Sequence, residues 1–387
     1  MKPTNPIFTG MPTTIFEAMS ALARETGAIN LGQGFPDVDG PEEIRRKAAE
    51  VAVDGPNQYP SMMGIPELRQ AVAAANRRFY GLDVDWQREV LVTSGATEAL
   101  ADAIFGLVAP GDEVIVIEPY YDSYVPIIRQ AGGTPVFVRI TPPEWALDAD
   151  RLAAAFGPKT KAIILNDPMN PAGKVFSEAE LGLIAELCLK HDAYVIADEV
   201  YEHLTFDGLK HQTLMSFPGM RERVVRIGSA GKTFSLTGWK IGYITAAPNL
   251  LGPIAKAHQF ITFTTPPNLQ AAVALGLGMD DAYFTDLAAS QAAKRDRLSA
   301  GLADAGFVVM PCQGTYFVTT DTGPLGIDDD AEACRRLTRE AGVAAVPVSA
   351  FYAGDAPTRF IRFCFCKRDE VLDAAVERLG RWLKRAA

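Results

Sequence analysis

The sequence lacks several features that would point to whole classes of protein. Its 47 acidic side chains outnumber its 37 basic ones, which gives a formal charge of -10. That balance argues against a nucleic acid as the main partner, because a phosphate backbone needs a basic face. No apolar run is long enough to cross a bilayer. Residues 1–6 lack the apolar core of a signal peptide, so a cytoplasmic protein is expected.

Cysteine and histidine are also scarce. The five cysteines are scattered and odd in number, which is typical of reduced thiols. Cys364 and Cys366 alternate as in a strand, so their sulfurs share one face, but no second pair with zinc spacing accompanies them. The four histidines, which include His258, show no ligand spacing. We therefore expect no metal site, buried thiols and solvated imidazoles.

What is present is the composition of an ordinary globular protein, 48% apolar and 22% charged over 387 residues. That length is enough for two domains and a large core. From residue 88 onward, continuous apolar runs alternate with helical stretches. The runs are at residues 90–93, 113–117, 135–140, 161–165, 194–197 and 224–228. This alternation predicts an α/β fold with a mostly parallel sheet covered by helices on both faces.

The character of the chain changes toward its C-terminal end. A long helix is expected around residues 280–297, and beyond it strand-like runs mix with helices, as in an α+β domain. We predict a large domain over residues 42–290 and a smaller α+β domain over residues 291–387. Residues 1–41 are expected to form an N-terminal arm that completes part of the smaller domain.

The apolar strand at 224–228 breaks into small residues and then presents Lys232. A lysine after a covered strand must be desolvated or consumed chemically. Three interpretations are open: a surface lysine in a turn, a nucleotide phosphate loop, or a lysine that binds a carbonyl cofactor as a Schiff base. The phosphate-loop motif fits poorly, since Arg226 stands where its first glycine belongs.

Other unusual residues also follow strands, where open α/β sheets bind ligands. The small residues at 94–97 open a helix and suit a phosphate, or form a plain N-cap. Asp198 ends an apolar strand and needs a cation, either a protonated ring nitrogen or a buried Arg or Lys. Lys240 suits a phosphate. Arg362, flanked by apolar residues, suits a substrate carboxylate or an internal salt bridge.

Three further side chains fit the same ligand. Tyr121 can lie flat on a planar cofactor or pack in the core. Tyr201, three residues after Asp198, can reach the same ring. Asn170, in a loop with two prolines, can donate to a phenolic oxygen or simply serve the turn. Together these residues describe a pyridine ring that carries a phosphate, a phenolate oxygen and an aldehyde.

Five motifs follow one another along nearly the whole chain. They are Ser-Gly-Ala-Thr-Glu-Ala (94–99), Asn-x-Pro-x-Asn-Pro-x-Gly (166–173), Asp-Glu-Val-Tyr (198–201), Ser-x-Gly-Lys-Thr-Phe-Ser-x-Thr-Gly-Trp-Lys (229–240) and Ile-Arg-Phe-Cys-Phe (361–365). In these motifs the chain resembles the fold-type I, pyridoxal-phosphate-dependent aminotransferases of class I. Residues 14–16, 19–23, 30–37 and 121–124 are most similar to the methionine/aromatic and kynurenine/glutamine aminotransferases.

The resemblance implies a role for each candidate residue. Lys232 would bind pyridoxal 5′-phosphate covalently and act as a base, and Asp198 would keep the pyridine nitrogen protonated. The catalytic residues would be Lys232, Asp198 and Tyr201. The residues that hold the cofactor would be Tyr59, Gly95, Ala96, Thr97, Tyr121, Asn170, Asp198, Tyr201, Ser229, Lys232 and Lys240. The residues that bind the substrate would be Phe16, Gly34, Asn170, Phe263 and Arg362, with Arg362 on the α-carboxylate.

The resemblance also implies a reaction and an assembly. The reaction would be a ping-pong transfer of an amino group from an L-amino acid to a 2-oxo acid. A homodimer would share its active sites, with Tyr59 and Phe263 lent to the partner. Lys240 departs from the arginine that many class I members carry there. No second arginine for a distal carboxylate is evident, which favours methionine, aromatic amino acids, kynurenine or glutamine as donor.

Three alternatives remain: an aspartate-type aminotransferase, a cysteine-S-conjugate β-lyase, and a non-catalytic regulatory domain that binds the same cofactor. The last is disfavoured, because such domains normally follow a helix-turn-helix segment and this sequence starts directly with the enzyme pattern.

Overall fold

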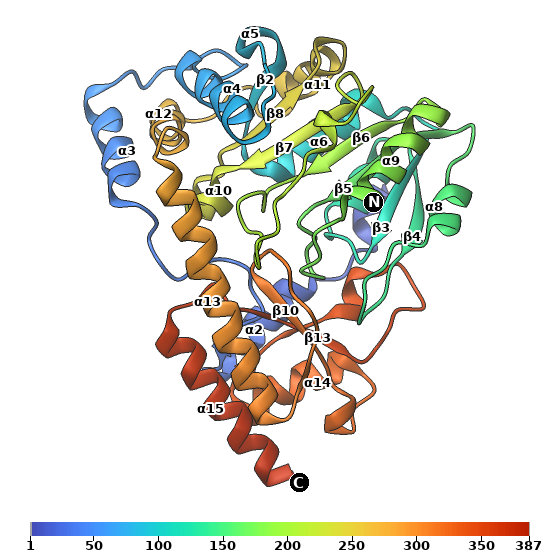
Figure 1. Cartoon of the computed structure of the whole chain (residues 1–387), viewed down its shortest axis with the longest axis vertical. Coiled ribbons are helices and arrows are strands. Elements are labelled where there is room, and N and C mark those ends of the chain that lie inside the picture. Colours follow the sequence, from blue (N-terminus) through green and yellow to red (C-terminus); the bar gives the residue numbers. More distant parts are fainter. Residues whose placement is uncertain (1, 387) are drawn as a thin grey trace.

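A computed structural model describes residues 2–386, and its centre is a sheet of seven strands (Figure 1). The strands are β2 (Val90–Thr93), β3 (Glu113–Glu118), β4 (Thr134–Arg139), β5 (Thr160–Asn166), β6 (Tyr194–Asp198), β7 (Val224–Ser229) and β8 (Gly242–Ala246). Their order is β2-β8-β7-β6-β5-β3-β4, and only β8 runs antiparallel to its neighbours. The sheet confirms the predicted α/β fold class.

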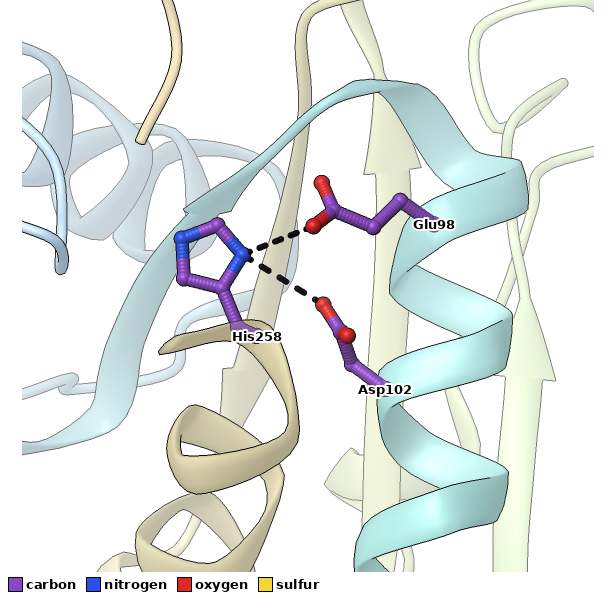
Figure 2. Close-up of side chains that lie close together, drawn as sticks. All are labelled: Glu98, Asp102 and His258. Atoms are coloured by element: carbon purple, nitrogen blue, oxygen red, sulfur yellow. Dashed lines mark hydrogen bonds and ion pairs between the residues drawn. The ribbon is translucent and has the colours of Figure 1, made fainter. Parts of the chain in front are cut away.

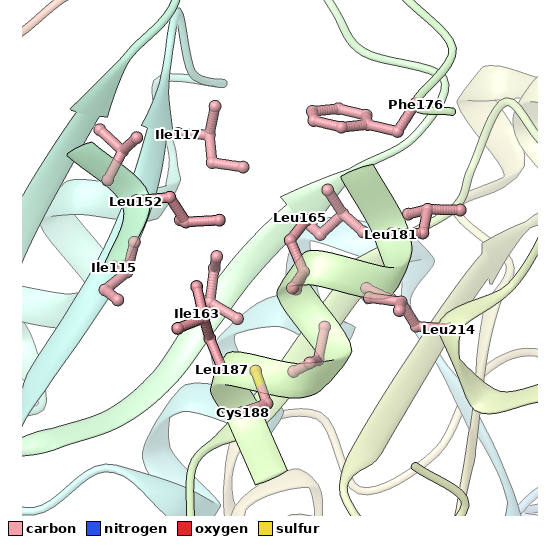
Figure 3. Close-up of a cluster of buried hydrophobic side chains, with 14 of the residues drawn as sticks. Ile115, Ile117, Leu152, Ile163, Leu165, Phe176, Leu181, Leu187, Cys188 and Leu214 are labelled. Carbon is pink, nitrogen blue, oxygen red and sulfur yellow. The ribbon is translucent and has the colours of Figure 1, made fainter. Parts of the chain in front are cut away.

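Successive residues of the strands point to opposite faces of the sheet, and both faces are covered. Val114 and Val116 pack with helices α6 (Gly95–Leu107), α7 (Tyr124–Gln130) and α11 (Pro248–Ile261). Ile115 and Ile117 point the other way, into a cluster that includes residues of α8 (Ala149–Ala155) and α9 (Glu178–His191) (Figure 3). This alternation holds the carboxyl ends of the strands in one layer.

Further helices extend the second face over β2 and β8. They are α3 (Glu42–Asp54), α4 (Pro66–Tyr80) and α12 (Pro267–Leu277), whose apolar residues share one buried cluster with Val92 and Tyr243. The short elements in this part are α1 (Pro6–Thr9), α5 (Trp86–Glu89), α10 (Ala230–Thr233), η1 (Leu214–Ser216) and η2 (Thr237–Trp239). None of the described helices is both long enough and apolar enough to span a bilayer.

A smaller sheet lies below the large one in Figure 1, with strand order β12-β13-β10-β9. Its strands are β9 (Val308–Val309), β10 (Phe317–Asp321), β12 (Val346–Pro347) and β13 (Phe360–Cys364). The helices around it are α2 (Ile15–Thr26), α13 (Asp281–Ala305), α14 (Asp330–Arg336), η3 (Gly323–Leu325), η4 (Leu337–Ala341), η5 (Val348–Phe351) and α15 (Asp369–Ala386).

Segments from both halves of the chain meet in this smaller part, whereas α1 near the N-terminus contacts α7 in the larger part. Strand β1 (Ile29–Asn30) pairs in parallel with β11 (Val343–Ala344), and the N-terminal helix α2 lies beside the C-terminal elements (Figure 1). That pairing agrees with the expected contribution of the N-terminal arm. The division at residues 41 and 290 itself stays a prediction.

One expectation about scarce residues holds and another fails. All five cysteines are free and buried, as predicted. The imidazole of His258, however, is not solvated: its exposed fraction is 0%. The prediction was wrong because spacing along the sequence does not show that α11 packs against α6, which places two carboxylates beside this ring.

Candidate functional site

A cavity of about 370 Å³ opens where the parallel strands end, and residues of the smaller sheet close its other side. Its wall includes every site residue predicted from the sequence except Tyr59 and Phe263. The predicted residues that line it are Phe16, Gly34, Gly95, Ala96, Thr97, Tyr121, Asn170, Asp198, Tyr201, Ser229, Lys232, Lys240 and Arg362. Segments more than 300 residues apart, those of Phe16 and Arg362, meet in this wall.

Lys232 lies in the short helix α10, directly after β7. Its Nζ donates to the carbonyl oxygen of Gly34 at 3.1 Å and lies 5.4 Å from the ring centre of Tyr201. The hydroxyl of Tyr316 donates to the Lys232 carbonyl at 2.6 Å and fixes its backbone. Burial lowers the pKa of Lys232. A larger share of neutral amine follows, and the neutral amine is the nucleophile and base.

Asp198 ends β6 and is 5% exposed. The hydroxyl of Tyr124 donates to its Oδ2 at 2.6 Å, while Oδ1 has no hydrogen-bond partner among the described residues. Burial raises the pKa of Asp198, and the bond from Tyr124 opposes that rise. A buried carboxylate with one free oxygen at a cavity wall fits a cationic N–H of a ligand.

The start of α6 forms a cradle for an anion. Gly95 has φ +75°, and a Cβ on it would lie 3.2 Å from Cε of Lys240. A Cβ on Gly242 would lie 2.6 Å from the carbonyl carbon of Gly95. The two glycines therefore let β8 and Lys240 approach the first turn of α6, where backbone N–H groups and the helix dipole favour a phosphate. Ser229 lines the same corner.

Arg362 lies on β13 with 1% of its surface exposed. Its Nη1 donates to Oδ1 of Asn170 at 2.7 Å and its Nη2 to the carbonyl of Gly32 at 2.6 Å, whereas Nε has no partner among the described residues. The guanidinium carbon lies 3.8 Å from the ring centre of Phe317. Because both partners are neutral, the internal salt-bridge interpretation fails.

The charge of Arg362 therefore remains available to a ligand. Burial lowers its pKa to about 10, which still leaves the guanidinium protonated at neutral pH. A buried cation whose hydrogen bonds go to neutral groups gains most from an incoming carboxylate.

Two tyrosines complete the wall. The ring of Tyr121 meets that of Tyr124 edge to face, with centres 5.8 Å apart, and Tyr201 meets Tyr316 in the same way at 5.6 Å. Burial raises the pKa of both Tyr121 and Tyr201. Both hydroxyls therefore stay protonated at neutral pH and can donate hydrogen bonds.

Tyr59 and Phe263 lie outside this cavity. Tyr59 is 84% exposed and Phe263 40% exposed, and their rings touch edge to face with centres 5.7 Å apart. Phe260 nearby is also 84% exposed.

The sequence reasoning missed several functional positions. Tyr124, the donor to Asp198, lay within the motif at 121–124, but nothing local showed that its hydroxyl points at β6. Gln33, Phe35 and Phe317 also line the cavity, and only their proximity to Gly34 and to β10 could have suggested it.

The fold and this site define the chain as an aminotransferase, an enzyme of the transaminase class. The model of the family "Aminotransferase class I and II" matches residues 26–379, and the chain belongs to that family. The family implies pyridoxal phosphate as cofactor and amino and 2-oxo acids as substrates. The resemblance noted in the motifs is thereby confirmed.

Individual relatives agree over nearly the whole chain. The chain is 48% identical to a probable N-succinyldiaminopimelate aminotransferase of Mycobacterium tuberculosis, with 97% of each covered. It is 42% identical to the methionine aminotransferase of Escherichia coli, with 95% of each covered. It is 38% identical to human kynurenine–oxoglutarate transaminase 3, covering 96% of this chain and 89% of that one.

A solved structure shows the same fold. That structure is N-succinyldiaminopimelate aminotransferase from Mycobacterium tuberculosis, with a TM-score of 0.96 and 47% identity over 98% of this chain and 100% of the other.

Proposed function

We propose that this aminotransferase holds pyridoxal 5′-phosphate in the 370 Å³ cavity and, as a homodimer, takes the amino group from an L-amino acid with an uncharged side chain. The observation that carries the proposal is the meeting of three groups in one cavity wall. They are the amine of Lys232, the unpartnered oxygen of Asp198 and the guanidinium of Arg362, whose partners are neutral.

The wall fits each part of that cofactor. The free Oδ1 of Asp198 is suited to a protonated ring nitrogen, and the first turn of α6 with Lys240 is suited to the phosphate. Tyr121 supplies a ring face, and Tyr201 and Asn170 supply donors for the ring oxygen. When bound, the cofactor supplies an electron sink that stabilises negative charge on the substrate's α-carbon.

The chain's own residues then handle the proton and the substrate. The neutral amine of Lys232 takes the α-proton of the substrate and would pass it to the former aldehyde carbon of the bound cofactor, since burial has lowered the pKa of Lys232. Arg362 binds the α-carboxylate and Asn170 fixes the guanidinium, so the α-hydrogen is presented to Lys232. Phe317 stacks under the guanidinium and excludes water from that pair.

The side-chain pocket favours an uncharged donor. Phe16, Phe35 and Phe317 line the cavity beside Arg362. The basic side chains that line it within the described residues are Lys232, Lys240 and Arg362, and each already has a role. An aspartate side chain would therefore bury a second carboxylate without a partner, which costs several kcal/mol, about 3–5 when one member of a buried pair is missing.

A second donor follows from the relatives. The relative at 48% identity is named for N-succinyldiaminopimelate, and an amino acid with a long acylated side chain also suits the apolar wall formed by Phe16 and Phe35. Its distal carboxylates would have to reach solvent, where they need no buried partner.

The exposed pair Tyr59 and Phe263 supports the proposed homodimer. Both side chains are exposed and their rings are in edge-to-face contact, yet neither lines this chain's cavity. We propose that each protomer places them against the partner's cofactor and substrate. The cytoplasmic location stays a prediction, which five buried free thiols support.

A titration of the reconstituted protein with amino acids tests the proposal. The visible absorbance of the bound cofactor should bleach with L-methionine, kynurenine, glutamine or the N-succinylated diamino acid, and a 2-oxo acid should restore it. A panel dominated by aspartate, or no bleaching with any amino acid, contradicts the proposal. Pyruvate released from a cysteine conjugate without any 2-oxo acid would show a β-lyase instead.

A further inference from the structure

A buried histidine lies between the phosphate cradle and the segments that carry Tyr59 and Phe263. Figure 2 shows His258, near the end of α11, facing Glu98 and Asp102 on α6. Its Nδ1 lies 2.9 Å from Oε1 of Glu98 and 3.5 Å from Oδ2 of Asp102, and its Nε2 lies 2.9 Å from the carbonyl oxygen of Met62. His258 and Asp102 are fully buried and Glu98 is nearly so.

The partners of the ring define its protonation. A carbonyl oxygen only accepts, so Nε2 carries a hydrogen toward Met62. Nδ1 faces two carboxylates, which also accept, so it carries the second hydrogen. The ring is therefore an imidazolium, and it neutralises charge that burial would otherwise make costly.

The surrounding groups agree with a charged ring. Burial alone would lower the pKa of His258, but the nearby carboxylates of Asp102 and Glu98 outweigh that effect and raise it to about 9. The charged groups that face the ring are the two carboxylates of α6. The loop before α4 presents the Met62 carbonyl, and Thr262 adds a hydroxyl beside Glu98.

Glu98 links this cluster to the phosphate cradle. The second oxygen of Glu98 accepts a hydrogen bond from the backbone N–H of Ser94, the N-cap residue of α6. Gly95, Ala96 and Thr97 follow directly in the cradle. A shift of Glu98 would therefore move the first turn of α6.

His258 itself contacts the two segments that carry Tyr59 and Phe263. Met62 lies three residues after Tyr59, in a loop held to β2 by a bond from Val92 to Met63. The backbone N–H groups of Thr262 and Phe263 both donate to the His258 carbonyl, at 3.1 and 2.9 Å. One residue thus fixes the Tyr59 loop through its ring and the Phe263 turn through its backbone.

We propose that His258 is a positioning residue that couples the phosphate cradle of its own protomer to Tyr59 and Phe263, the side chains lent to the partner. The inference rests on the proposed homodimer. Cofactor binding would order the start of α6. Through its contacts with Glu98 and Met62, the imidazolium would then also order the surface that binds the partner.

A divalent cation is the competing occupant of this cluster, since the three ligand atoms lie within 4.8 Å of one another. The 2.9 Å separation of Nδ1 and Glu98 Oε1 favours the proton, because it is a hydrogen-bond distance. Two ligand atoms of a tetrahedral zinc ion lie farther apart, about 3.3 Å.

The test compares dimer dissociation constants of the apo and cofactor-loaded protein by sedimentation. In the wild type, pyridoxal phosphate should tighten the dimer. In His258→Gln that tightening should fall roughly tenfold, the effect of losing a charge-assisted hydrogen bond. His191→Gln, at the end of α9 on the opposite face of the sheet, is the control and should keep the wild-type tightening. A folded His258→Gln protein with the wild-type ratio of constants overturns the proposal.

A rescue variant separates positioning from simple loss of stability. In His258→Gln/Asp102→Asn the buried negative charge is reduced, so folding stability should recover while the coupling stays weak. If the coupling recovers together with stability, the role of His258 is only structural and the proposal fails.

Nitrogen NMR of the apo wild type, labelled at histidine, tests the ring without any variant or cofactor. Both ring nitrogens of His258 should remain protonated at pH 7.5 and titrate near pH 9. A neutral ring, or one equivalent of zinc bound at Nδ1, overturns the inference. Failure of the wild type to bind pyridoxal phosphate would instead refute the proposed function, and the NMR result would stand apart from it.

Discussion

The hydroxyl of Tyr124 donates a 2.6 Å hydrogen bond to one oxygen of Asp198 and leaves the other oxygen free at the cavity wall. The tyrosine lies 74 residues earlier in the chain, at the start of α7. Its bond stabilises the ionised form of a carboxylate that burial would protonate. Asp198 can therefore stay anionic opposite a ring nitrogen.

Tyr124→Phe should weaken that anion without emptying the site. Loss of one hydrogen bond to a charged group costs about 1.5–3 kcal/mol. We expect kcat to fall roughly tenfold or more, with the acidic limb of the kcat profile displaced to higher pH, because the pKa of Asp198 rises further. Steady-state kinetics between pH 5 and 9 measure both effects. A variant with lower kcat but an unmoved acidic limb would contradict this explanation.

Asp198→Asn should have opposite effects on the apo and loaded protein. Burial raises the folded pKa of Asp198 above its unfolded value, so the favourable protonated form is populated at low pH and is lost as the pH rises. This buried carboxyl therefore carries an ionisation cost in the apo protein that grows as the pH rises. The amide removes it, so apo Asp198→Asn should melt above the apo wild type at pH 7, and the gap should shrink toward pH 4.

The loaded protein supplies the control for that experiment. With pyridoxal phosphate the wild type should gain more in melting temperature than Asp198→Asn, because only the carboxylate pairs with a cationic nitrogen. Equal gains for both proteins would argue against Asp198 as the ring partner.

The large sheet was predictable because most of its strands are continuous apolar runs. The grouping of the candidate site residues was predictable because polar residues follow those runs. Strand β8 was missed. Its residues Gly242–Ala246 follow the lysine motif with no intervening long helix, and a single short run does not reveal that it pairs antiparallel between β2 and β7.

The polar contacts inside the core were beyond the sequence for a different reason. Glu98 and Asp102, four residues apart on a helix, look like an ordinary charged face. Their partner His258 lies 160 residues from Glu98 along the chain. Tyr124 and Asp198 are likewise far apart along the chain, by 74 residues. Helix packing brings such partners together, and no local pattern encodes it.

Lys232→Ala should remove the amine that moves the α-proton. Turnover should fall by at least ~10⁴-fold, the upper range for a general base that also binds the cofactor. The cofactor should still bind through the cradle and Asp198, but its absorbance should no longer resist dialysis. Added methylamine should restore part of the activity by replacing the missing amine. Transamination at the wild-type rate would refute the assignment.

Arg362→Lys keeps a positive charge but loses the planar fork. The ammonium cannot bond Asn170, Gly32 and a carboxylate in one plane, so kcat/KM for the amino acid should fall roughly 10–100-fold. Cofactor affinity should stay unchanged, since Arg362 lies on the substrate side. Arg362→Met tests the charge itself: it should lose more activity with amino acids while losing little with amines that lack a carboxylate.

The last prediction concerns the stability of the layer beneath the site. Arg226 on β7 is buried and pairs with Glu199 and Glu202, and the guanidinium also lies against the ring of Tyr80. Arg226→Met would leave two buried carboxylates without their cation, so the free energy of unfolding should fall by about 3–5 kcal/mol. Urea unfolding at pH 7 measures it. The triple variant Arg226→Met/Glu199→Gln/Glu202→Gln should recover much of that loss, because neutral side chains need no counter-ion. If the single variant is as stable as the wild type, the ion pairs of Arg226 with Glu199 and Glu202 do not hold β6 and β7 together. In that case the hydrogen bond from Tyr124 and the strand pairing alone fix the position of Asp198.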